Sequence, residues 1–181
     1  AAWSGKFMDA SAIGAKLALA RGTLETYIST LLTMFIFDKV PAWSKSDYDK
    51  IGKQAKVFLC DTGMMAAVLG WKRKAISLDA DRSGKLMETF VYQELAAQTE
   101  ALPGMRLYHY RDRANREIDF LIENDDGDLA GIEVKASHHI GADDFKHINW
   151  FRHNLAKKRR FCGIVLYAGA HTLSFGKDNF A

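Results

Sequence analysis

Four ionisable side chains fall in an order that suits phosphodiester chemistry. Asp119 lies in one strand-like segment, and Glu133 and Lys135 lie in the next. Residues two apart in a strand share a face, so Glu133 and Lys135 project together, toward the side where a neighbouring strand can present Asp119. Glu88 borders the apolar stripe of a helical segment, where a carboxylate needs a cation, a metal or a hydrogen-bond partner. A first-turn Glu that only complements the helix dipole is the alternative for this residue.

These residue types match the requirements of a hard divalent cation. Mg²⁺ is bound by oxygen atoms, usually one or two carboxylates together with waters and substrate phosphate oxygens. Asp119 and Glu133 can supply the carboxylates, the Val134 carbonyl a further oxygen, and Glu88 an auxiliary ligand. Such a cation acidifies a water and neutralises charge on the scissile phosphate, and Lys135 can orient that water. The pattern predicts phosphodiester chemistry that depends on a divalent cation.

The elements that would hold these groups follow from periodicity. Residues 84–98 are expected to form a helix with Met87, Val91 and Leu95 on one stripe and Leu86 and Phe90 beside it. Strands are expected over 106–111, 117–123 and 129–136, separated by turn residues at 112–115 and 124–127. On the second strand Ile118, Phe120 and Ile122 alternate with Asp119, so Asp119 should point away from one apolar face. A helix over 143–156 and strands over 163–167 and 172–175 complete this part.

The first third of the chain has the element order of a winged helix. Residues 10–20 read as a helix, Arg21-Gly22 as a break and Thr23 as the N-cap of a second helix. Strands over 35–43 and 55–60 then flank a Lys-rich stretch. The apolar stripe of the second helix comprises Leu24, Tyr27, Ile28, Leu31, Leu32 and Phe35. Such a module can place its second helix in the major groove of DNA. A packing or oligomerisation module is the alternative, because the exposed face of that helix carries no Arg or Lys to read bases.

Basic residues gather in two runs that could contact phosphates. The nucleic-acid-binding residues expected from them are Lys45, Lys50, Lys53, Lys157, Lys158, Arg159 and Arg160. A solvated surface is the alternative for both runs, and the second also falls at a helix C-terminus, where cations offset the dipole. The formal net charge of +3 neither requires nor excludes a nucleic-acid partner.

Three other motifs are weaker indications of a functional site. Asp61, in Asp61-Thr62-Gly63, is expected to cap a helix over 62–69, although the same tripeptide occurs in retroviral-type aspartic proteases. Ser83-Gly84-Lys85 lacks the earlier glycine and the following Ser or Thr of a phosphate-binding loop, so no nucleotide site is expected. The histidines do not have zinc-ligand spacing and are read as surface residues; they include His138, His139, His147 and His153.

The bulk properties are those of an ordinary globular chain. Its 181 residues are 48% hydrophobic and 26% charged, which suits one or two small domains. The longest apolar runs are far below the roughly 20 residues of a membrane-spanning helix, so no membrane association is expected. The start has neither an initiator Met nor a secretory signal and looks like that of a fragment. Cys60 and Cys162 are expected as reduced, buried thiols, which favours a cytoplasmic location.

Together the motifs resemble a known superfamily. Asp119, then Glu-x-Lys at 133–135, with Glu88 on the preceding helix, is similar to the signature of PD-(D/E)XK nucleases. Residues 56–63, 116–120 and 133–137, with Gly84 and Glu88, look like the uncharacterised domain that follows the ATPase module of many prokaryotic AAA-type ATP-binding proteins.

This resemblance implies a fold, a function and partners. The fold would be α/β (α+β): a restriction-endonuclease-like mixed sheet flanked by helices over 62–181, after a winged-helix-like segment over 1–61. The function would be that of a Mg²⁺- or Mn²⁺-dependent nuclease domain with DNA as substrate and an AAA-type ATPase module as partner. A non-catalytic DNA- or protein-binding regulatory module of that ATPase is the alternative, because fold does not determine activity. Homo-oligomerisation is left open.

Overall fold

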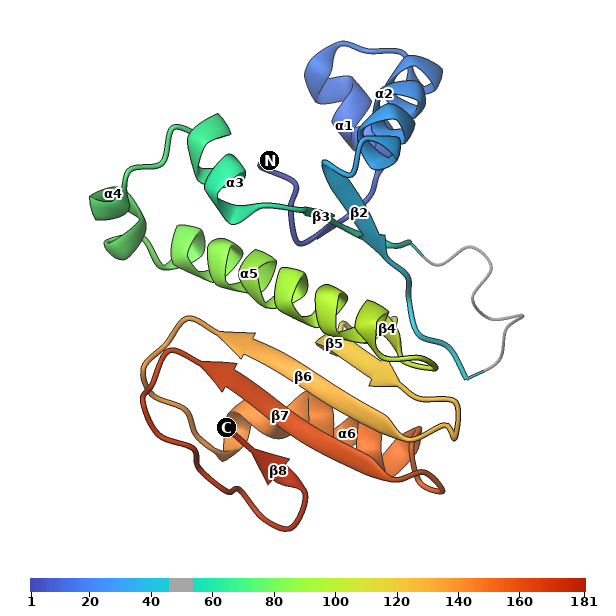
Figure 1. The fold of residues 1–181 in the computed structure, drawn as a ribbon, viewed down its shortest axis with the longest axis vertical. Coiled ribbons are helices and arrows are strands. Elements are labelled where there is room, and N and C mark those ends of the chain that lie inside the picture. Colours follow the sequence, from blue (N-terminus) through green and yellow to red (C-terminus); the bar gives the residue numbers. More distant parts are fainter. Residues whose placement is uncertain (46–53) are drawn as a thin grey trace.

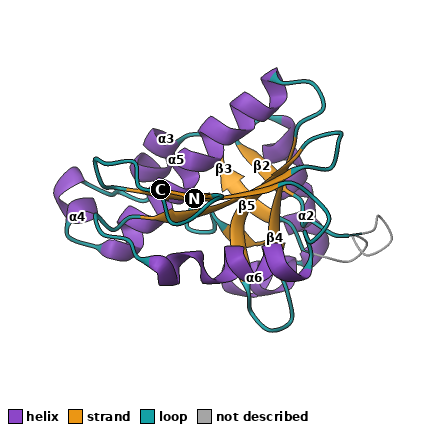
Figure 2. Ribbon diagram, turned by 90° about the horizontal axis from the view of Figure 1, so that it is seen from below, coloured by secondary structure: helices purple, strands orange, loops and turns teal. Residues whose placement is uncertain are grey.

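The computed structural model describes residues 1–45 and 54–181, which form two sheets and the helices around them. Lys50 and Lys53, expected to contact nucleic acid, lie outside the described residues. Helix α5 (Ala80–Ala101) lies across one face of a five-stranded sheet (Figure 1). Helix α6 (Lys146–Asn154) covers the opposite face, as the view from below shows (Figure 2). The expected mixed α/β architecture is therefore confirmed.

The five-stranded sheet begins as the predicted meander. Its order is β4-β5-β6-β7-β8, antiparallel from β4 to β6 and parallel from β6 to β8. The strands are β4 (Arg106–Arg111), β5 (Glu117–Glu123), β6 (Leu129–Lys135), β7 (Phe161–Tyr167) and β8 (Asn179–Phe180). The crossover from β6 to β7 contains the 3₁₀ helix η2 (Ala142–Phe145) and α6. The meander matches the turn chemistry of the sequence, because Gly127 and Asn115 both adopt the positive φ that such turns need.

Helix α5 is longer than its apolar pattern indicated. Asp79 caps it by accepting hydrogen bonds from the backbone N–H groups of Asp81 and Arg82, so the helix begins four residues before Gly84. Val91 and Tyr92 are buried on its inner face, whereas Phe90 is 53% exposed. Phe90 was wrongly placed beside the inner stripe, because Thr89 occupies the buried position next to it.

A second, three-stranded sheet lies above α5. Its order is β1-β3-β2, all antiparallel, from β1 (Lys6–Phe7), β2 (Phe37–Val40) and β3 (Lys56–Leu59). The hairpin strands β2 and β3 were expected, and β1 was not, because two residues are too few to show a periodicity. Val40 and Phe58 of this sheet pack in one cluster with Tyr92 of α5 and Phe120 of β5. The hairpin thus shares a core with the larger sheet.

The helix pair before the hairpin departs from the predicted boundaries. Helix α1 (Ala10–Leu17) ends at Ala18, whose positive φ of 53° reverses the chain, and α2 (Arg21–Thr33) begins directly after Ala20. The predicted break at Arg21-Gly22 is therefore wrong, and Arg21 instead pairs with Glu25 one turn along α2.

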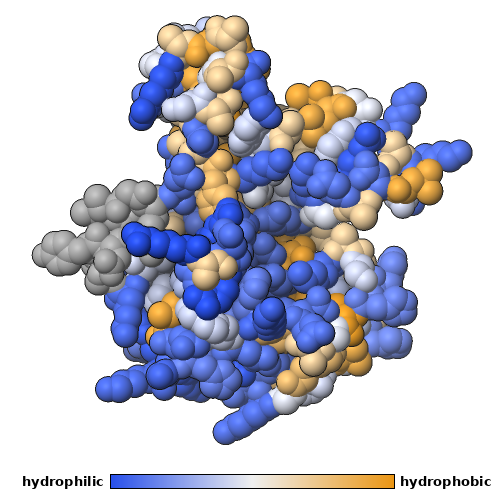
Figure 3. All heavy atoms as spheres, turned by 180° about the vertical axis from the view of Figure 1, so that it is seen from behind, coloured by the Kyte–Doolittle hydropathy of each residue, from blue (hydrophilic) through white to orange (hydrophobic). Residues whose placement is uncertain are grey.

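The apolar stripe of α2 is only partly buried. Leu24 and Ile28 are covered, but Tyr27 is 54% exposed and Phe35, beyond the end of the helix, is 83% exposed. Exposed apolar side chains also occur on helix α3 (Thr62–Val68) and after helix α4 (Arg73–Ser77), namely Met64, Val68 and Leu78. In the view from behind, separate groups of hydrophobic spheres are visible on the helix pair at the top and on the side of α3 and α4 (Figure 3).

The carboxy-terminal strand is not where the alternation placed it. Residues 172–175 contribute only an isolated bridge at Ser174, and β8 pairs with β7 through Asn179. This close approach depends on Gly163, because a Cβ there would overlap the Asn179 side-chain oxygen. Cys60 and Cys162 are both free thiols, as expected, but half-buried rather than buried.

Asp61 caps helix α3 as predicted. Its carboxylate accepts a hydrogen bond from the Met64 backbone N–H, and the chain continues into a helix rather than the second apolar strand of an aspartic protease. Replacement of Asp61 by Ala should lower the free energy of unfolding by about 1 kcal/mol, because an orphan N–H loses its acceptor. Chemical denaturation would measure this, with Asp61→Asn as the control that keeps the cap. An alanine variant as stable as the wild type would contradict the capping role.

Candidate functional site

A β-bulge lies at the position of Asp119. Tyr108 pairs with Leu121 and Tyr110 with Ile118, so β5 has one residue more than β4 over this stretch. As a result Ile118 and Leu121 both pack on the α6 side, whereas Phe120 packs on the α5 side. The predicted strict alternation of Ile118 and Phe120 on one face is therefore wrong. Bulges redirect side chains, and this one turns Asp119 toward α5 and the small sheet.

Strands β5 and β6 separate next to this bulge. Their pairing runs from Glu123 and Leu129 to Phe120 and Ile132, and it does not continue to Asp119 and Glu133 within these described strands. Strand β6 stays paired with β7 as far as Lys135. The opening between β5 and β6 is named here the strand fork.

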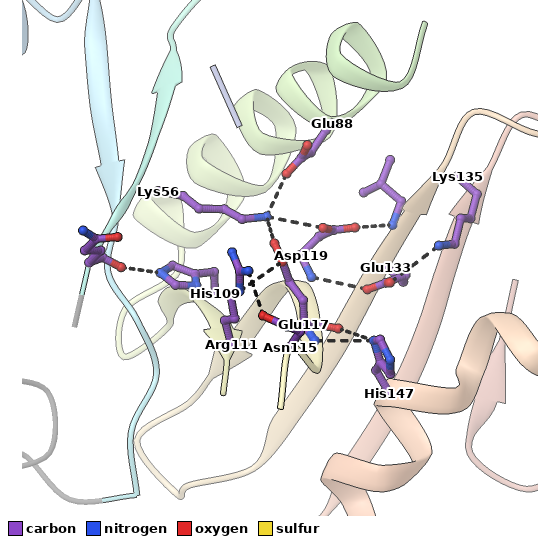
Figure 4. Close-up of polar contacts among 12 residues, drawn as sticks. Lys56, Glu88, His109, Arg111, Asn115, Glu117, Asp119, Glu133, Lys135 and His147 are labelled. Carbon is purple, nitrogen blue, oxygen red and sulfur yellow. Dashed lines mark hydrogen bonds and ion pairs between the residues drawn. The ribbon is translucent and has the colours of Figure 1, made fainter. Parts of the chain in front are cut away.

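The backbone N–H groups at the strand fork are bonded by carboxylates instead of carbonyls. The Val134 N–H donates to Asp119 Oδ2 at 2.9 Å, and the Asp119 N–H approaches Glu133 Oε2 at 3.4 Å. Lys135 Nζ lies 3.6 Å from Glu133 Oε1. The structure thus brings together Asp119, Glu133, Val134 and Lys135, all of which the sequence singled out (Figure 4).

Lys56 completes the site from the small sheet. Its side chain is 2% exposed, and the ammonium points from β3 toward three carboxylates (Figure 4). The distances from Nζ are 2.7 Å to Glu117 Oε1, 3.0 Å to Glu88 Oε1 and 3.4 Å to Asp119 Oδ1. Sequence reasoning assigned Lys56 no place in the site and missed this role. The signal available was its position as the first residue of an otherwise apolar strand, which favours burial.

Glu88 is held between Lys56 and the amino-terminal segment. A Cβ on Gly5 would lie 2.7 Å from Glu88 Oε2, so only a glycine lets the backbone pass this closely. Gly5 also has a positive φ of 74°, which glycine adopts without strain. Glu88 lines a pocket of about 330 Å³ together with Gly5, Asp81 and Lys85, which gives its carboxylate a route to solvent.

The carboxylates of the site are hard to ionise together. Burial raises the pKa of Glu88 to about 7, although Lys56 acts in the opposite direction. Burial, assisted by the Asp119 carboxylate, raises the pKa of Glu133 to about 8. For Lys56 burial alone would lower the pKa, but Glu88, Asp119 and Glu117 outweigh it and raise the pKa above its usual value. One ammonium cannot neutralise every carboxylate, so protons stay on the cluster at neutral pH.

The residues at the strand fork fit a Mg²⁺ or Mn²⁺ ion that also uses water or phosphate ligands. Within residues 1–45 and 54–181, no three His, Cys, Asp or Glu side chains are grouped closely enough to hold a metal alone. Mg²⁺ usually needs only one or two protein carboxylates, which Asp119 and Glu133 can provide. Both are mostly buried, with side chains 19% and 13% exposed, and both use their oxygens in internal contacts.

The carboxy-terminal basic run lies far from the strand fork. Residues 157–160 precede the start of β7, which pairs with the start of β6, whereas Glu133 and Lys135 are at its other end. Six residue steps of strand separate the two ends by about 20 Å. Lys157 and Lys158 are exposed and Arg160 is 90% exposed, but Arg159 pairs with Glu123.

The run instead borders a groove of its own. The groove is about 1100 Å³ in volume, and Lys157 and Arg160 are among its lining residues. Lys45, the described member of the other basic run, is exposed. The expected nucleic-acid-binding residues of the carboxy-terminal run therefore lie apart from the strand fork.

Three of the histidines singled out by the sequence contact backbone carbonyls. His147 Nδ1 lies 3.1 Å from the Glu117 carbonyl oxygen at the start of β5, and His138 Nδ1 lies 2.7 Å from that of Ala168. His153 Nδ1 lies 2.6 Å from the Asn149 carbonyl oxygen. His147 therefore helps to fix the strand that carries Asp119.

Comparison with known proteins assigns the larger sheet to a family. The family model described as domain of unknown function (DUF4143) matches residues 83–181, which is more than half of the chain. The chain belongs to the DUF4143 family. The DUF4143 part contains Glu88, Asp119, Glu133 and Lys135. A second model, domain of unknown function (DUF8612), matches residues 1–75 and contains Lys56.

Two curated proteins that carry the description uncharacterised are similar to this DUF4143 protein. The chain is similar to the uncharacterised proteins Mb2031c of Mycobacterium bovis and Rv2008c of Mycobacterium tuberculosis, each 24% identical over 133 residues. The match covers 74% of this chain but 29% of each relative, so the chain spans less than a third of their length. No solved structure matches the chain. Among the described helices, none has both the length and the apolar character that crossing a bilayer requires.

Proposed function

We propose that this chain is a PD-(D/E)XK-type nuclease domain that hydrolyses DNA phosphodiesters with Mg²⁺ or Mn²⁺ and serves a cytoplasmic AAA-type ATPase. The observation that carries the proposal is the strand fork, where Asp119 and Glu133 converge from separating strands beside Lys135. The opening coincides with a β-bulge, and bulges are over-represented next to active sites.

Each side chain at the strand fork would have a role in the reaction that fits its position. Asp119, Glu133 and the Val134 carbonyl would hold the cation, with Glu88 as an auxiliary ligand. When bound, the cation would polarise the scissile phosphate and promote water attack. Lys135, the most exposed member at 36%, can reach a phosphate oxygen and stabilise the charge that develops there.

DNA cleavage in the presence of Mn²⁺ tests this function. Circular, linear and branched DNA would be incubated with the wild type and with Glu133→Ala and Lys135→Ala. We expect cleavage by the wild type and a loss of about 100-fold or more in each variant, because cation binding or charge stabilisation is removed. The matched control is Lys39→Ala, a charge loss at an exposed position of β2 that belongs to no proposed site. Cleavage that survives both site substitutions, or no cleavage at all, would refute the proposal.

A non-catalytic binding module is the second candidate, and one observation favours it. Both oxygens of Asp119 are already engaged, one by the Val134 N–H and the other by Lys56. A domain of this kind would bind DNA or protein for the ATPase through its exposed basic residues. Fluorescence anisotropy with labelled DNA would separate the two candidates: binding that falls with Lys157→Ala and Lys158→Ala, with no cleavage, supports the module.

A further inference from the structure

Lys56 lies where a cation is needed at the strand fork. It occupies β3, the central strand of the small sheet, and its side chain crosses to the DUF4143 part. Its ammonium is buried and is shared by Glu117, Glu88 and Asp119. An ammonium has three N–H donors, so three carboxylates leave it no donor for a phosphate or another ligand. Lys56 therefore acts here as an internal cation and not as a substrate-binding group.

The contact with Asp119 gives this internal cation a consequence for metal binding. Asp119 Oδ2 is bonded by the Val134 N–H at 2.9 Å, so Oδ1, which faces Lys56 at 3.4 Å, is the oxygen held by the looser contact. A divalent ion bound by Asp119 would meet the Lys56 ammonium at short range. In a buried setting two positive charges at such a distance repel strongly, because water screens them poorly.

We propose that Lys56 competes with the divalent cation for Asp119, so that the amino-terminal hairpin sets the metal affinity of the strand fork. This inference rests on the proposed function, because it concerns the same cation. The competing residue comes from the segment that the DUF8612 model matches, while the proposed ligands lie in the DUF4143 part. A displacement of β3 would withdraw the ammonium and leave the acidic side chains to the metal.

The sign of the effect distinguishes competition from a purely structural role. If Lys56 only held the carboxylates in place, its removal would loosen them and weaken metal binding. If Lys56 competes, its removal takes away a repulsive charge and strengthens metal binding. The readout is therefore the Mn²⁺ dissociation constant and not enzymatic activity.

Calorimetric titration of Mn²⁺ into the 181-residue chain tests the proposal. The variants are Lys56→Met, which removes the charge with little change of shape, and Lys56→Arg, the matched control that keeps it. We expect the dissociation constant to fall about ten-fold or more in Lys56→Met and not to fall in Lys56→Arg. In Lys56→Met with Asp119→Asn, this gain should disappear.

A second variant protects the test against loss of folding. Lys56→Met with Glu117→Gln removes one of the carboxylates left without a cation and keeps Asp119, Glu88 and Glu133. It is compared with Glu117→Gln alone, and the fold of each variant is checked by circular dichroism. The double variant should bind Mn²⁺ more tightly than Glu117→Gln alone, by the same factor as above. Addition of Mn²⁺ should also raise the melting temperature of the double variant more than that of Glu117→Gln.

The outcomes separate this inference from the function on which it rests. If the wild type binds Mn²⁺ and the folded Lys56 variants bind it equally or more weakly, the competition is overturned. The proposed function is then left intact. No Mn²⁺ uptake by the wild type or any variant would overturn both. Binding that appears or tightens only when Lys56 is replaced supports the competition directly.

Discussion

Replacement of Lys56 by Met should lower the free energy of unfolding by about 3 kcal/mol at neutral pH. Removal of one partner from a buried ion pair leaves the other charge without compensation, and here three carboxylates share the single ammonium. The raised pKa of Lys56 fixes the pH range: its stabilisation is complete below the usual value of 10.5 and is lost only as the pH rises above it. Lys56 is therefore charged across the neutral and acidic range, and the size of the loss there depends on how many of its carboxylate partners are ionised.

Urea denaturation at two pH values measures this loss. The penalty should be smaller at pH 5 than at pH 7.5, because Glu88, whose pKa is already raised to about 7, can then stay protonated. Lys39→Met is the matched control, since Lys39 is exposed and pairs with Val57 in the same small sheet. It should change stability by less than about 0.5 kcal/mol. Equal effects of the two substitutions would show that Lys56 is not a buried counter-charge.

Replacement of Glu133 by Gln should instead stabilise the protein at alkaline pH, by about 2–4 kcal/mol at pH 9. Burial and Asp119 raise the pKa of Glu133 from 4.5 to about 8. The folded state therefore keeps a proton that the unfolded state releases between these values. Folding stability from this group consequently falls as the pH rises through that range, and Gln, which does not titrate, avoids the loss.

The pH profile is the decisive part of this prediction. The difference between Glu133→Gln and the wild type should be near zero at pH 5 and grow up to about pH 8 to 9, as measured by denaturation at each pH. Glu94→Gln, at an exposed position on α5, is the control and should give no such trend. A difference that stays flat across the range would mean that the Glu133 carboxyl is not disfavoured by the fold. A gain in stability from a substitution that removes a proposed ligand is typical of functional sites.

Much of the larger sheet and its helices could be predicted from the sequence. The boundaries of β4 and β5 agree with the predicted segments, because apolar alternation and the turns before Glu117 and Leu129 mark both ends. The helix N-cap at Asp61 could likewise be predicted from a single residue type. Signals of this kind depend only on residues that are close in the sequence, so the folded structure keeps them.

Features that depend on contacts distant in sequence could not be predicted. The bulge at Asp119 exists only relative to β4, and the strand fork only relative to β6. The burial of Lys56 depends on carboxylates more than thirty residues away. The last strand was misplaced because Asn179 pairs through its fit against Gly163, which alternation does not encode. The candidate carboxylates and Lys135 were thus found from their spacing, but the buried ammonium of Lys56 was not.

Anomalous diffraction from crystals grown with Mn²⁺ tests the central claim most directly. The account predicts a manganese peak at the strand fork, about 2.1 Å from carboxylate oxygens of Asp119 and Glu133 and near the Val134 carbonyl. In the same crystals the Lys56 ammonium should lie farther from Asp119 Oδ1 than the 3.4 Å seen here. Crystals with manganese bound elsewhere, and with Lys56 still joined to all three carboxylates, would contradict it.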